Sequence, residues 1–379
     1  SDVSIYTLYI YIDGNRDNPI TMTNQNFRFN IYGEGTGAIY KENVIQNETT
    51  TPSSSSSTFL NTEVLRNQIE SITIEKTNVV PNNAKYSKDI SSKQDGSVML
   101  WYTDKDNNSL YEISIGSENG SVEANTNGSG MFAYLDNVST LDLSGLDTSN
   151  MTSMSKMFFN SKSLTNIDVS EFDTSKVVNM SRMFQGCEKL EELNLNFFDT
   201  ANTTNMSFMF INCHKLKKID ISNFNTSKVT NMVAMFQACQ NLIDIDVSHF
   251  DTSNVTLMGA MFFNCKSLKK LDVTNFNTSN VTDMGGMFWD CESLTELDLS
   301  SFDTSNVITT GGNYGMLSYL KLKTIYVSEL WDMSNVTNSK NMFLGSTSLV
   351  GTVPFDSTKT DVSMANYTNG YLTYKKNTN

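Results

Sequence analysis

The sequence predicts an α/β fold: a solenoid of stacked repeats made of short parallel strands plus short helices or 3-10 turns, with a β-rich N-terminal region. The first observation behind this prediction is a strict period, since Met-Phe recurs every 26 residues from Met131 to Met287. The second is the pattern inside each repeat, where strand-like alternation is followed by a helical spacing of apolar residues. One repeat cannot bury its apolar side alone, so the repeats are expected to stack and share a core.

The composition of the chain excludes several classes of partner. Its 41 acidic and 27 basic residues give a net charge of −14. Such a charge repels phosphate backbones, so no nucleic acid is expected as a partner. No run of 18 apolar residues occurs, and we therefore expect no membrane span in this chain. The first residues lack the basic segment and the cleavage site of an intact signal peptide.

Three segments precede the repeats. Residues 1–50 are predicted to be a β-rich N-terminal region, because SIYTLYIYID and FRFNIYGEG alternate and are rich in aromatic residues. Residues 51–58 are rich in Ser and Thr and have the composition of a linker. Residues 59–130 include the strand-like stretches SVMLWYTD and SLYEISIG, and they are expected to cap the first repeat of the solenoid.

The repeat at residues 261–286 illustrates the structure predicted for each unit. Its segment KLDVT (270–274) alternates between polar and apolar residues, as a short strand with one buried face requires. Val281, Met284 and Met287 then follow at intervals of three, which predicts a helical stripe or a few tight turns. Each unit should therefore consist of a strand, a turn and a short helix or turns, with one apolar side.

The repeats are predicted to occupy residues 131–349, with one irregularity. Met287 and Met342 are 55 residues apart, so two units share an excess of three residues, which the segment 308–316 is expected to carry. Residues 350–379 should form a C-terminal cap or tail, because the last repeat also needs a cover.

The cysteines all fall in one column, four residues after the Met of each repeat: Cys187, Cys213, Cys239, Cys265 and Cys291. Because stacked strands lie about 5 Å apart, the sulfur atoms should form a ladder inside the core. No Cys or His pair has zinc-site spacing, so no metal site and no cofactor are expected. Buried free thiols are the favoured interpretation, and a disulfide between neighbouring repeats stays open. The Met column is interpreted as core.

Three polar columns follow from the same alignment. One lies on the exposed side of each strand: Asp142, Asp168, Asn194, Asp220, Asp246, Asp272 and Asp298. Hydrogen bonds to the Ser or Thr two residues later are its favoured explanation, and bridging calcium ions are an alternative. A second Asp/Asn column, from Asp147 to Asp303, is expected to cap the turn before each helical stripe. A column of threonines comes directly after it: Thr148, Thr174, Thr200, Thr226, Thr252, Thr278 and Thr304.

The candidate binding residues lie on the concave strand face, where one column varies from repeat to repeat. Two residues before each strand Asp come Thr140, Asn166, Glu192, Lys218, Asp244, Lys270 and Glu296. Stacking constrains the core columns but leaves this one free, so it should determine the choice of partner. The predicted set is Asn166, Asp168, Glu192, Lys218, Asp220, Asp244, Asp246, Lys270, Asp272, Glu296 and Asp298. Pairing of Lys218 with Asp220 and of Lys270 with Asp272 is the alternative explanation.

Catalysis has little support in the sequence. There is no set of nucleophile, histidine and acid, no phosphate-binding loop and no acid pair that stands apart from the columns. We therefore expect no catalytic residues and no enzymatic activity.

The consensus of the repeats, F-D-T-S-x-V-T-x-M-x-x-M-F-x-x-C-x-x-L-x-x-L-D-L-S, resembles the BspA-like leucine-rich-repeat surface proteins of bacteria. The resemblance covers about residues 131–349 and is nearly letter for letter at 172–195, 250–273 and 276–299. Ala201 and Thr203 depart from it. The resemblance implies a leucine-rich-repeat solenoid at the bacterial cell surface or secreted. It also implies adhesion, which is the binding of host or matrix proteins or of other cells.

Two other classes of function stay open from the sequence. The chain could be a structural spacer or stalk if its exposed columns serve only solubility. It could also be a carbohydrate-binding or ice-binding module if the threonine column forms a flat exposed ladder.

Overall fold

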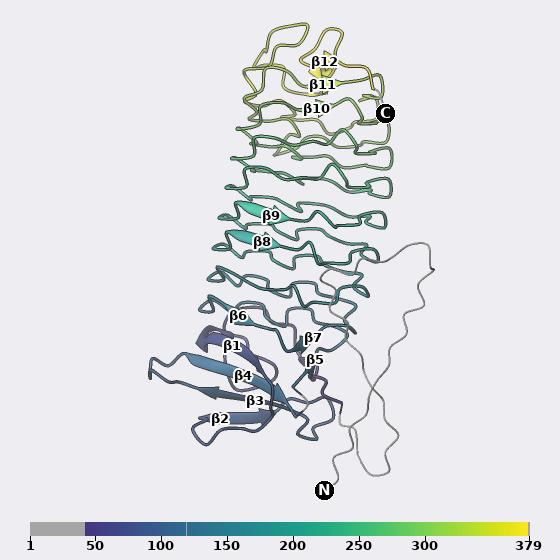
Figure 1. Cartoon of the computed structure of the whole chain (residues 1–379). Coiled ribbons are helices and arrows are strands. Elements are labelled where there is room, and N and C mark those ends of the chain that lie inside the picture. Colours follow the sequence, from purple (N-terminus) through teal and green to yellow (C-terminus); the bar gives the residue numbers. More distant parts are fainter. Residues whose placement is uncertain (1–41, 119, 378–379) are drawn as a thin grey trace, which may run out of the picture. The chain divides into compact units, whose positions relative to one another are not determined.

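The computed structural model describes residues 42–118 and 120–377, which belong to one compact unit beginning at Lys41. The strands predicted within residues 1–41 lie outside this part. The repeats form a stack of narrow coils, with strands β1 to β4 beside the first of them (Figure 1). The described chain consists mostly of short strands, turns and loops. Its helices are two single turns of 3-10 helix, η1 (Arg66–Gln68) and η2 (Val362–Met364).

The residues before the first repeat form a five-stranded sheet that continues into that repeat. The strand order is β2-β3-β4-β1-β6, with antiparallel pairing from β2 to β4 and parallel pairing from β4 to β6. The strands are β1 (Ile69–Glu75), β2 (Tyr86–Asp89), β3 (Val98–Thr103), β4 (Tyr111–Ser117) and β6 (Leu141–Asp142). The strands predicted at SVMLWYTD and SLYEISIG are therefore β3 and β4. Pairing of Ile72 with Leu141 covers the end of the stack with β1.

The segment 51–58, which its composition predicts to be a linker, is held by backbone contacts. The Ser57 carbonyl accepts the Arg66 amide at 3.0 Å, and Thr58 bridges to Leu65. Pro52 is buried. Serine hydroxyls also bond within the segment, as where Ser57 Oγ accepts the Ser53 amide at 3.1 Å. Local side-chain bonds of this kind let a Ser-rich stretch form a fixed turn.

Neighbouring repeats are joined by parallel backbone pairing along two lines. On the first line lie strands of two or three residues: β6, β8 (Glu192–Asn194), β9 (Lys218–Asp220), β10 (Asp298–Leu299) and β11 (Tyr326–Val327). Two further strands, β5 (Val122–Glu123) and β7 (Leu146–Asp147), pair in parallel at a separate place, at the turn that follows β6. β8 pairs with β9 at a shift of one repeat, from Glu192 to Lys218. On the second line single bridges link residues one repeat apart, such as Asn205 with Asn231. The backbone thus repeats with the period of the sequence.

The helical stripe predicted in each repeat is a run of tight turns and contains no helix in the described chain. The Met261 amide bonds to the Met258 carbonyl at 3.2 Å, and the Cys265 amide bonds to the Phe262 carbonyl at 3.2 Å. The Phe262 amide, between them, bonds across to the Met287 carbonyl of the next repeat at 3.0 Å. Ala260 has φ +58°, which interrupts a right-handed helix. The amides that a helix would use internally therefore join the repeats.

The irregularity predicted at residues 308–316 is confirmed by the register. Asp283 still bridges to Thr309, 26 residues later. A few residues on, the Phe288 amide bonds to the Met316 carbonyl, 28 residues later, where a regular repeat such as Phe262 to Met287 spans 25. The three extra residues therefore lie between Thr309 and Met316.

The core of the stack consists of columns of identical side chains. Phenylalanine rings of successive repeats stack with centroids 5.4–6.0 Å apart and interplanar angles of at most 16°. These rings are fully buried and belong to Phe158, Phe184, Phe210, Phe236, Phe262 and Phe288. Because each ring contacts the one above and the one below, each repeat depends on its neighbours for the burial of its apolar side.

The last described residues close the other end of the stack. β12 (Thr373–Tyr374) pairs in parallel with β11 and adds one more strand to the line. Tyr371 and Leu372 are fully buried, and the Trp331 indole donates to the Ala365 carbonyl at 3.0 Å. This segment gives the final repeat an apolar cover.

Candidate functional site

The structure places all eleven predicted binding residues on the exposed side of the short strands, which we call the strand face. Nine of the eleven are exposed, and Asp220 and Asp298 are half-buried. The residues between them, such as Leu193 and Leu271, are buried in the core. The strand alternation predicted from KLDVT is therefore correct, and the polar columns do reach solvent.

The strand Asp column bonds to the Ser or Thr that follows it, as predicted. Asp220 Oδ1 accepts the Ser222 amide at 3.1 Å and the Ser222 hydroxyl at 2.7 Å, and Asp246 bonds to Ser248 in the same way. These hydrogen bonds stabilise the ionised form and hold the pKa of Asp220 and of Asp246 below the usual range. Each carboxylate therefore has one oxygen engaged in its own turn, and no calcium ion is needed to explain the column.

Asp298 differs from the rest of its column because the C-terminal segment covers it. Lys375 makes an ion pair and a hydrogen bond with its Oδ2, and Ser300 donates its amide to Oδ1 at 3.0 Å. Burial raises the pKa of Asp298, but the hydrogen bonds from Lys375 and Ser300 outweigh it and leave the pKa lowered. The Asp298 carboxylate therefore holds the C-terminal segment against the stack, and Lys375 blocks a partner from binding it.

Five of the predicted residues lie together around one hollow with a volume of about 430 Å³. We call it the strand-face hollow, and its polar lining includes Asn166, Asp168, Glu192, Lys218 and Asp220. The other predicted residues continue along the same columns beyond it. The hollow spans three successive repeats, so one partner group could contact all three at once.

Lys218 has no carboxylate within ion-pair distance in the described part of the chain. The predicted pairs of Lys218 with Asp220 and of Lys270 with Asp272 do not form there. Lys218 acts on Asp220 only through space, where its charge contributes to the lowered pKa of that carboxyl. The ion pairs that do join repeats lie beside the strands, as between Lys217 and Glu191 at 2.7 Å. Lys218 is exposed and lines the hollow, so its ammonium is accessible to a partner there.

Phe197 also lines the strand-face hollow, and the sequence reasoning missed it. Its side chain is 55% exposed, although most phenylalanines of the chain are buried. The same column carries polar or small residues in the other repeats, such as Asn223, whose amide donates to the Asn196 carbonyl of the preceding repeat at 2.6 Å. A phenylalanine cannot make that bond. An apolar residue in a polar column is the signal that could have identified it.

The threonine column cannot be an exposed ladder, so that expectation is wrong. The side chains of Thr148, Thr174, Thr200, Thr226, Thr252, Thr278 and Thr304 are at most 1% exposed. Each hydroxyl donates to a carbonyl of the next repeat, as Thr174 Oγ1 does to the Asp199 carbonyl at 2.9 Å. The threonine side chains are buried because their hydroxyls bond to the backbone of the next repeat. The period of the sequence gives their spacing but not whether they face the core or solvent.

The five cysteines are free and fully buried, in agreement with the favoured interpretation. Each sulfur donates to the carbonyl of a core phenylalanine at 3.0–3.2 Å, as Cys265 does to Phe236. Burial raises the pKa of Cys213 and of Cys265 to about 12. Residues 42–118 and 120–377 contain no group of three or more His, Cys, Asp or Glu side chains that could hold a metal ion.

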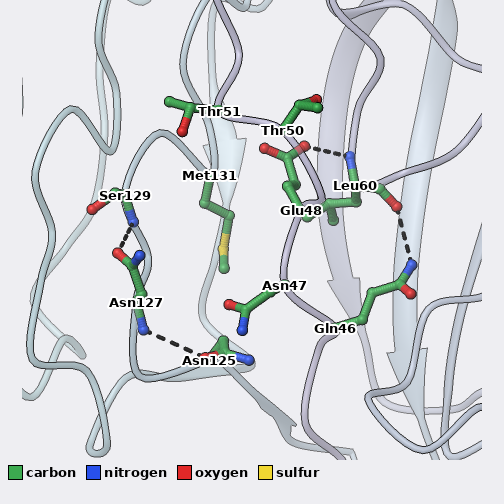
Figure 2. Close-up of a pocket in the computed structure, with 10 residues that line it drawn as sticks. All are labelled: Gln46, Asn47, Glu48, Thr50, Thr51, Leu60, Asn125, Asn127, Ser129 and Met131. Carbon is green, nitrogen blue, oxygen red and sulfur yellow. Dashed lines mark hydrogen bonds between the residues drawn. The ribbon is translucent and has the colours of Figure 1, made fainter.

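A second hollow, of about 280 Å³, lies where residues 46–51 meet the first repeat (Figure 2). Its polar side chains bond mostly to the surrounding protein: the Gln46 amide donates to the Leu60 carbonyl at 3.3 Å, and Asn127 Oδ1 accepts the Ser129 amide at 3.1 Å. Glu48 accepts the Leu60 amide and pairs with the buried Arg66. These bonds tie the N-terminal segment to the stack, so we interpret this hollow as a structural junction.

The comparisons with known proteins identify a family and no function. The family described as "Mycoplasma protein of unknown function, DUF285" matches residues 126–242, 212–322 and 312–378. These overlapping matches cover more than half of the chain and support a repeat protein. None of the curated proteins and none of the solved structures compared with the chain matches it. In the described residues, no helix has the length and apolar character that crossing a membrane requires.

Proposed function

We propose that the chain, which belongs to the DUF285 family, is an extracellular, non-enzymatic binding protein with a BspA-like leucine-rich-repeat solenoid. The proposed partners are host or matrix proteins, or another cell, bound through the strand face. The proposed location is the bacterial cell surface or the medium. The observation that carries the binding role is the strand-face hollow, which the exposed side chains of Phe197 and Lys218 both line.

The leucine-rich-repeat assignment is supported by the line of short parallel strands. In a fold of this class, the leucines of L-x-x-L-x-L face inward and the residues between them face outward. Leu190, Leu193 and Leu195 are at most 4% exposed here, and Glu192 and Asn194 between them are exposed. Parallel pairing of β8 with β9 repeats this arrangement in the next unit.

The strand-face hollow has the composition that protein interfaces favour at their centre. An aromatic side chain that a partner covers contributes a large apolar area, and a neighbouring charge adds specificity. Phe197 supplies the first, while Lys218 and the acidic Glu192 and Asp168 supply the second. The flat polar columns on either side would form the rim of the interface.

The test is the binding of purified collagen, laminin and fibronectin, and of intact host cells, to the immobilised chain. A double variant, Phe197→Asn with Lys218→Ala, should weaken the interaction at least about tenfold, because each side chain belongs to the expected centre. Asn is the residue at 223 in the same column, so the fold tolerates it.

The matched control is Val178→Asn with Lys228→Ala. Val178 is 44% exposed, and Lys228 is exposed and bonds to Asn202, so both are surface residues outside the strand-face hollow. This control should bind as the unchanged chain does. Equal binding by the hollow variant, or an equal loss in the control, would refute the proposed site.

A spacer role is a second candidate, because backbone pairing joins each repeat to the next along the stack. Parallel bridges run without a gap from Asn127 to Asn338 along the second line. If the chain only holds another module away from a surface, removal of one 26-residue repeat should shorten its reach by about 5 Å without changing any attachment.

A further inference from the structure

We propose that the chain carries a saccharide-binding site at the break in its period, where a neutral sugar ring packs against Tyr314 and Phe263. The site is a hollow of about 530 Å³ whose lining includes Phe263, Asp283, Asn313 and Tyr314. We call it the insertion hollow. It shares no lining residue with the strand-face hollow, so the proposal stands apart from the protein-binding function proposed above.

The insertion forms a fixed loop that presents Tyr314. The Met316 amide donates to the Thr310 carbonyl at 2.7 Å, and the Gly312 amide donates to the Lys340 carbonyl of the next repeat at 2.9 Å. Tyr314 is 54% exposed, but its ring meets Phe263 edge-on with centroids 5.0 Å apart. The extra residues thus place an aromatic ring where regular repeats have none. Contacts with Phe263 and Trp289 hold the Tyr314 ring in its orientation.

The hollow exists because one column loses its side chains along the stack. The residue just before each Met has positive φ in seven successive repeats, and these residues are Gly130, Lys156, Arg182, Phe208, Ala234, Ala260 and Gly286. At positions 182 and 208 this column is filled, since the Arg182 guanidinium lies 4.2 Å from the centroid of the Phe208 ring. Ala260 and Gly286 leave the same space open next to Phe263.

The walls of the hollow combine aromatic surface with unengaged polar groups. Phe263 stacks on Trp289 with centroids 4.3 Å apart, which fixes the ring that faces the hollow. Asp283 Oδ1 accepts the Gly285 amide at 2.8 Å. Its Oδ2 and the side-chain amides of Gln237 and Asn313 make no hydrogen bond to the residues that the structure describes. These carboxylate and amide groups can donate to and accept from adjacent hydroxyls.

This combination fits a neutral sugar better than the other small ligands that aromatic sites bind. A pyranose has an apolar face of C–H groups and a rim of hydroxyls, which match the rings and the planar polar groups respectively. The net charge of −14 and the nearby Asp283 disfavour an anionic sugar. A cage for a quaternary ammonium ion needs several open ring faces, and here Phe263 and Trp289 cover each other's faces.

The experiment follows tryptophan fluorescence of the full chain during titration with neutral hexasaccharides. The probes are β-1,4-linked N-acetylglucosamine, β-1,4-glucose, α-1,4-glucose and β-1,4-mannose. Trp101 and Trp331 are 5% and 7% exposed, so the half-buried Trp289, which contacts both Phe263 and Tyr314, should dominate the change. At least one probe should give a saturable change, whereas a proline-rich peptide and tetramethylammonium should give none.

Two variants remove the site in opposite ways. Tyr314→Ala deletes a wall, and Ala260→Arg refills the hollow with the residue that position 182 carries at nearly the same φ, +60° against +58°. Each should weaken saccharide binding at least about tenfold, with thermal unfolding by circular dichroism reporting that the fold is kept. Tyr374→Ala is the matched control, because Tyr374 is 48% exposed and its hydroxyl bonds to Glu329, away from the hollow.

Three results would overturn the proposal: no saturable change with any of the four hexasaccharides up to about 10 mM, a change that the folded Ala260→Arg variant retains, or binding of the peptide or the ammonium probe in place of the sugars. Loss of matrix-protein binding in the strand-face variant together with retained saccharide binding would support two separate sites. Binding of matrix proteins by the unchanged chain without binding of any saccharide would reject the insertion hollow alone.

Discussion

Replacement of Arg66 by Met should separate the N-terminal sheet from the stack of repeats. The Arg66 side chain is fully buried and bonds to Glu48 Oε1 at 2.6 Å. Its guanidinium also donates to the carbonyls of Met131 at 3.0 Å and Ala133 at 2.8 Å in the first repeat, and to that of Thr58 at 3.3 Å. Met keeps much of the apolar stem of Arg66 and removes every one of these hydrogen bonds.

The expected loss is about 3–5 kcal/mol of unfolding free energy, which is the usual cost of breaking a buried ion pair by removing one partner. The contacts give a similar figure. Three carbonyls lose a donor at about 1 kcal/mol each, and the Glu48 carboxylate loses its counter-charge. Glu48 remains 12% exposed, so some water can reach it and the lower half of the range is the better expectation.

The loss should grow as the pH rises. Burial raises the pKa of Glu48, while Arg66 lowers it in opposition, so removal of Arg66 should raise this pKa further. A carboxyl whose folded pKa lies above its unfolded value contributes stability that is complete below the unfolded pKa, near 4.5, and is lost as the pH rises through the folded pKa. The Arg66→Met variant should therefore be least impaired near pH 4 and most impaired near pH 8.

Urea unfolding at three pH values measures this, with amide hydrogen exchange locating the weakened region. With a slope of about 2 kcal/mol per M, a loss of about 4 kcal/mol moves the midpoint by about 2 M. The double variant Arg66→Met/Glu48→Gln should lose the pH dependence. A loss below about 1 kcal/mol, or one that is the same at every pH in the single variant, would show that the pair does not hold the junction.

Three further predictions concern the core of the stack. Phe236→Ala should cost about 3–5 kcal/mol in urea unfolding, because it removes a fully buried ring stacked on two others, and a cost under 1 kcal/mol would contradict the shared core. The five cysteines should resist a thiol reagent at pH 8 until urea unfolds the chain, because burial raises their pKa, and any rapid native reaction would contradict their placement. Thr203→Val should stabilise the chain by up to about 1 kcal/mol, because the equivalent residues of five other repeats are buried valines. Clear destabilisation in urea unfolding would mean that the hydrogen bond of the Thr203 hydroxyl to the Val177 carbonyl matters more than apolar burial.

Much of the fold could be predicted from the sequence because a period constrains every repeat at once. The Met, Phe and Cys columns had to be buried in all repeats or in none, so their placement followed from spacing alone. The local conformation did not follow. Apolar spacing in Val281, Met284 and Met287 fits both a helix and a run of turns, and cross-repeat amide bonds decided for turns. An exposed threonine ladder was considered because spacing shows that the threonines recur, but not whether their side chains face the core or solvent.

The candidate sites were less predictable because they depend on departures from the period. The variable column on the strand face was recognised, but Phe197 was not, although it stands in a polar column. The insertion was located by counting, but its aromatic contacts depend on how the loop folds back over Phe263 and Trp289. A consensus averages out such residues, so it describes the core well and the surface poorly.

Stacking itself explains why a function should reside at these departures. A residue inside the stack contacts its own copies above and below, as Phe236 does, so a change in one repeat disturbs two others and the column stays uniform. An exposed residue such as Phe197 has no such constraint. A regular surface also presents the same groups when a partner is shifted by one repeat. Such a surface can bind the partner without fixing its position along the stack. Only an irregular repeat fixes where a partner sits, and both hollows proposed here contain one: Phe197 in the first and the loop at 309–316 in the second.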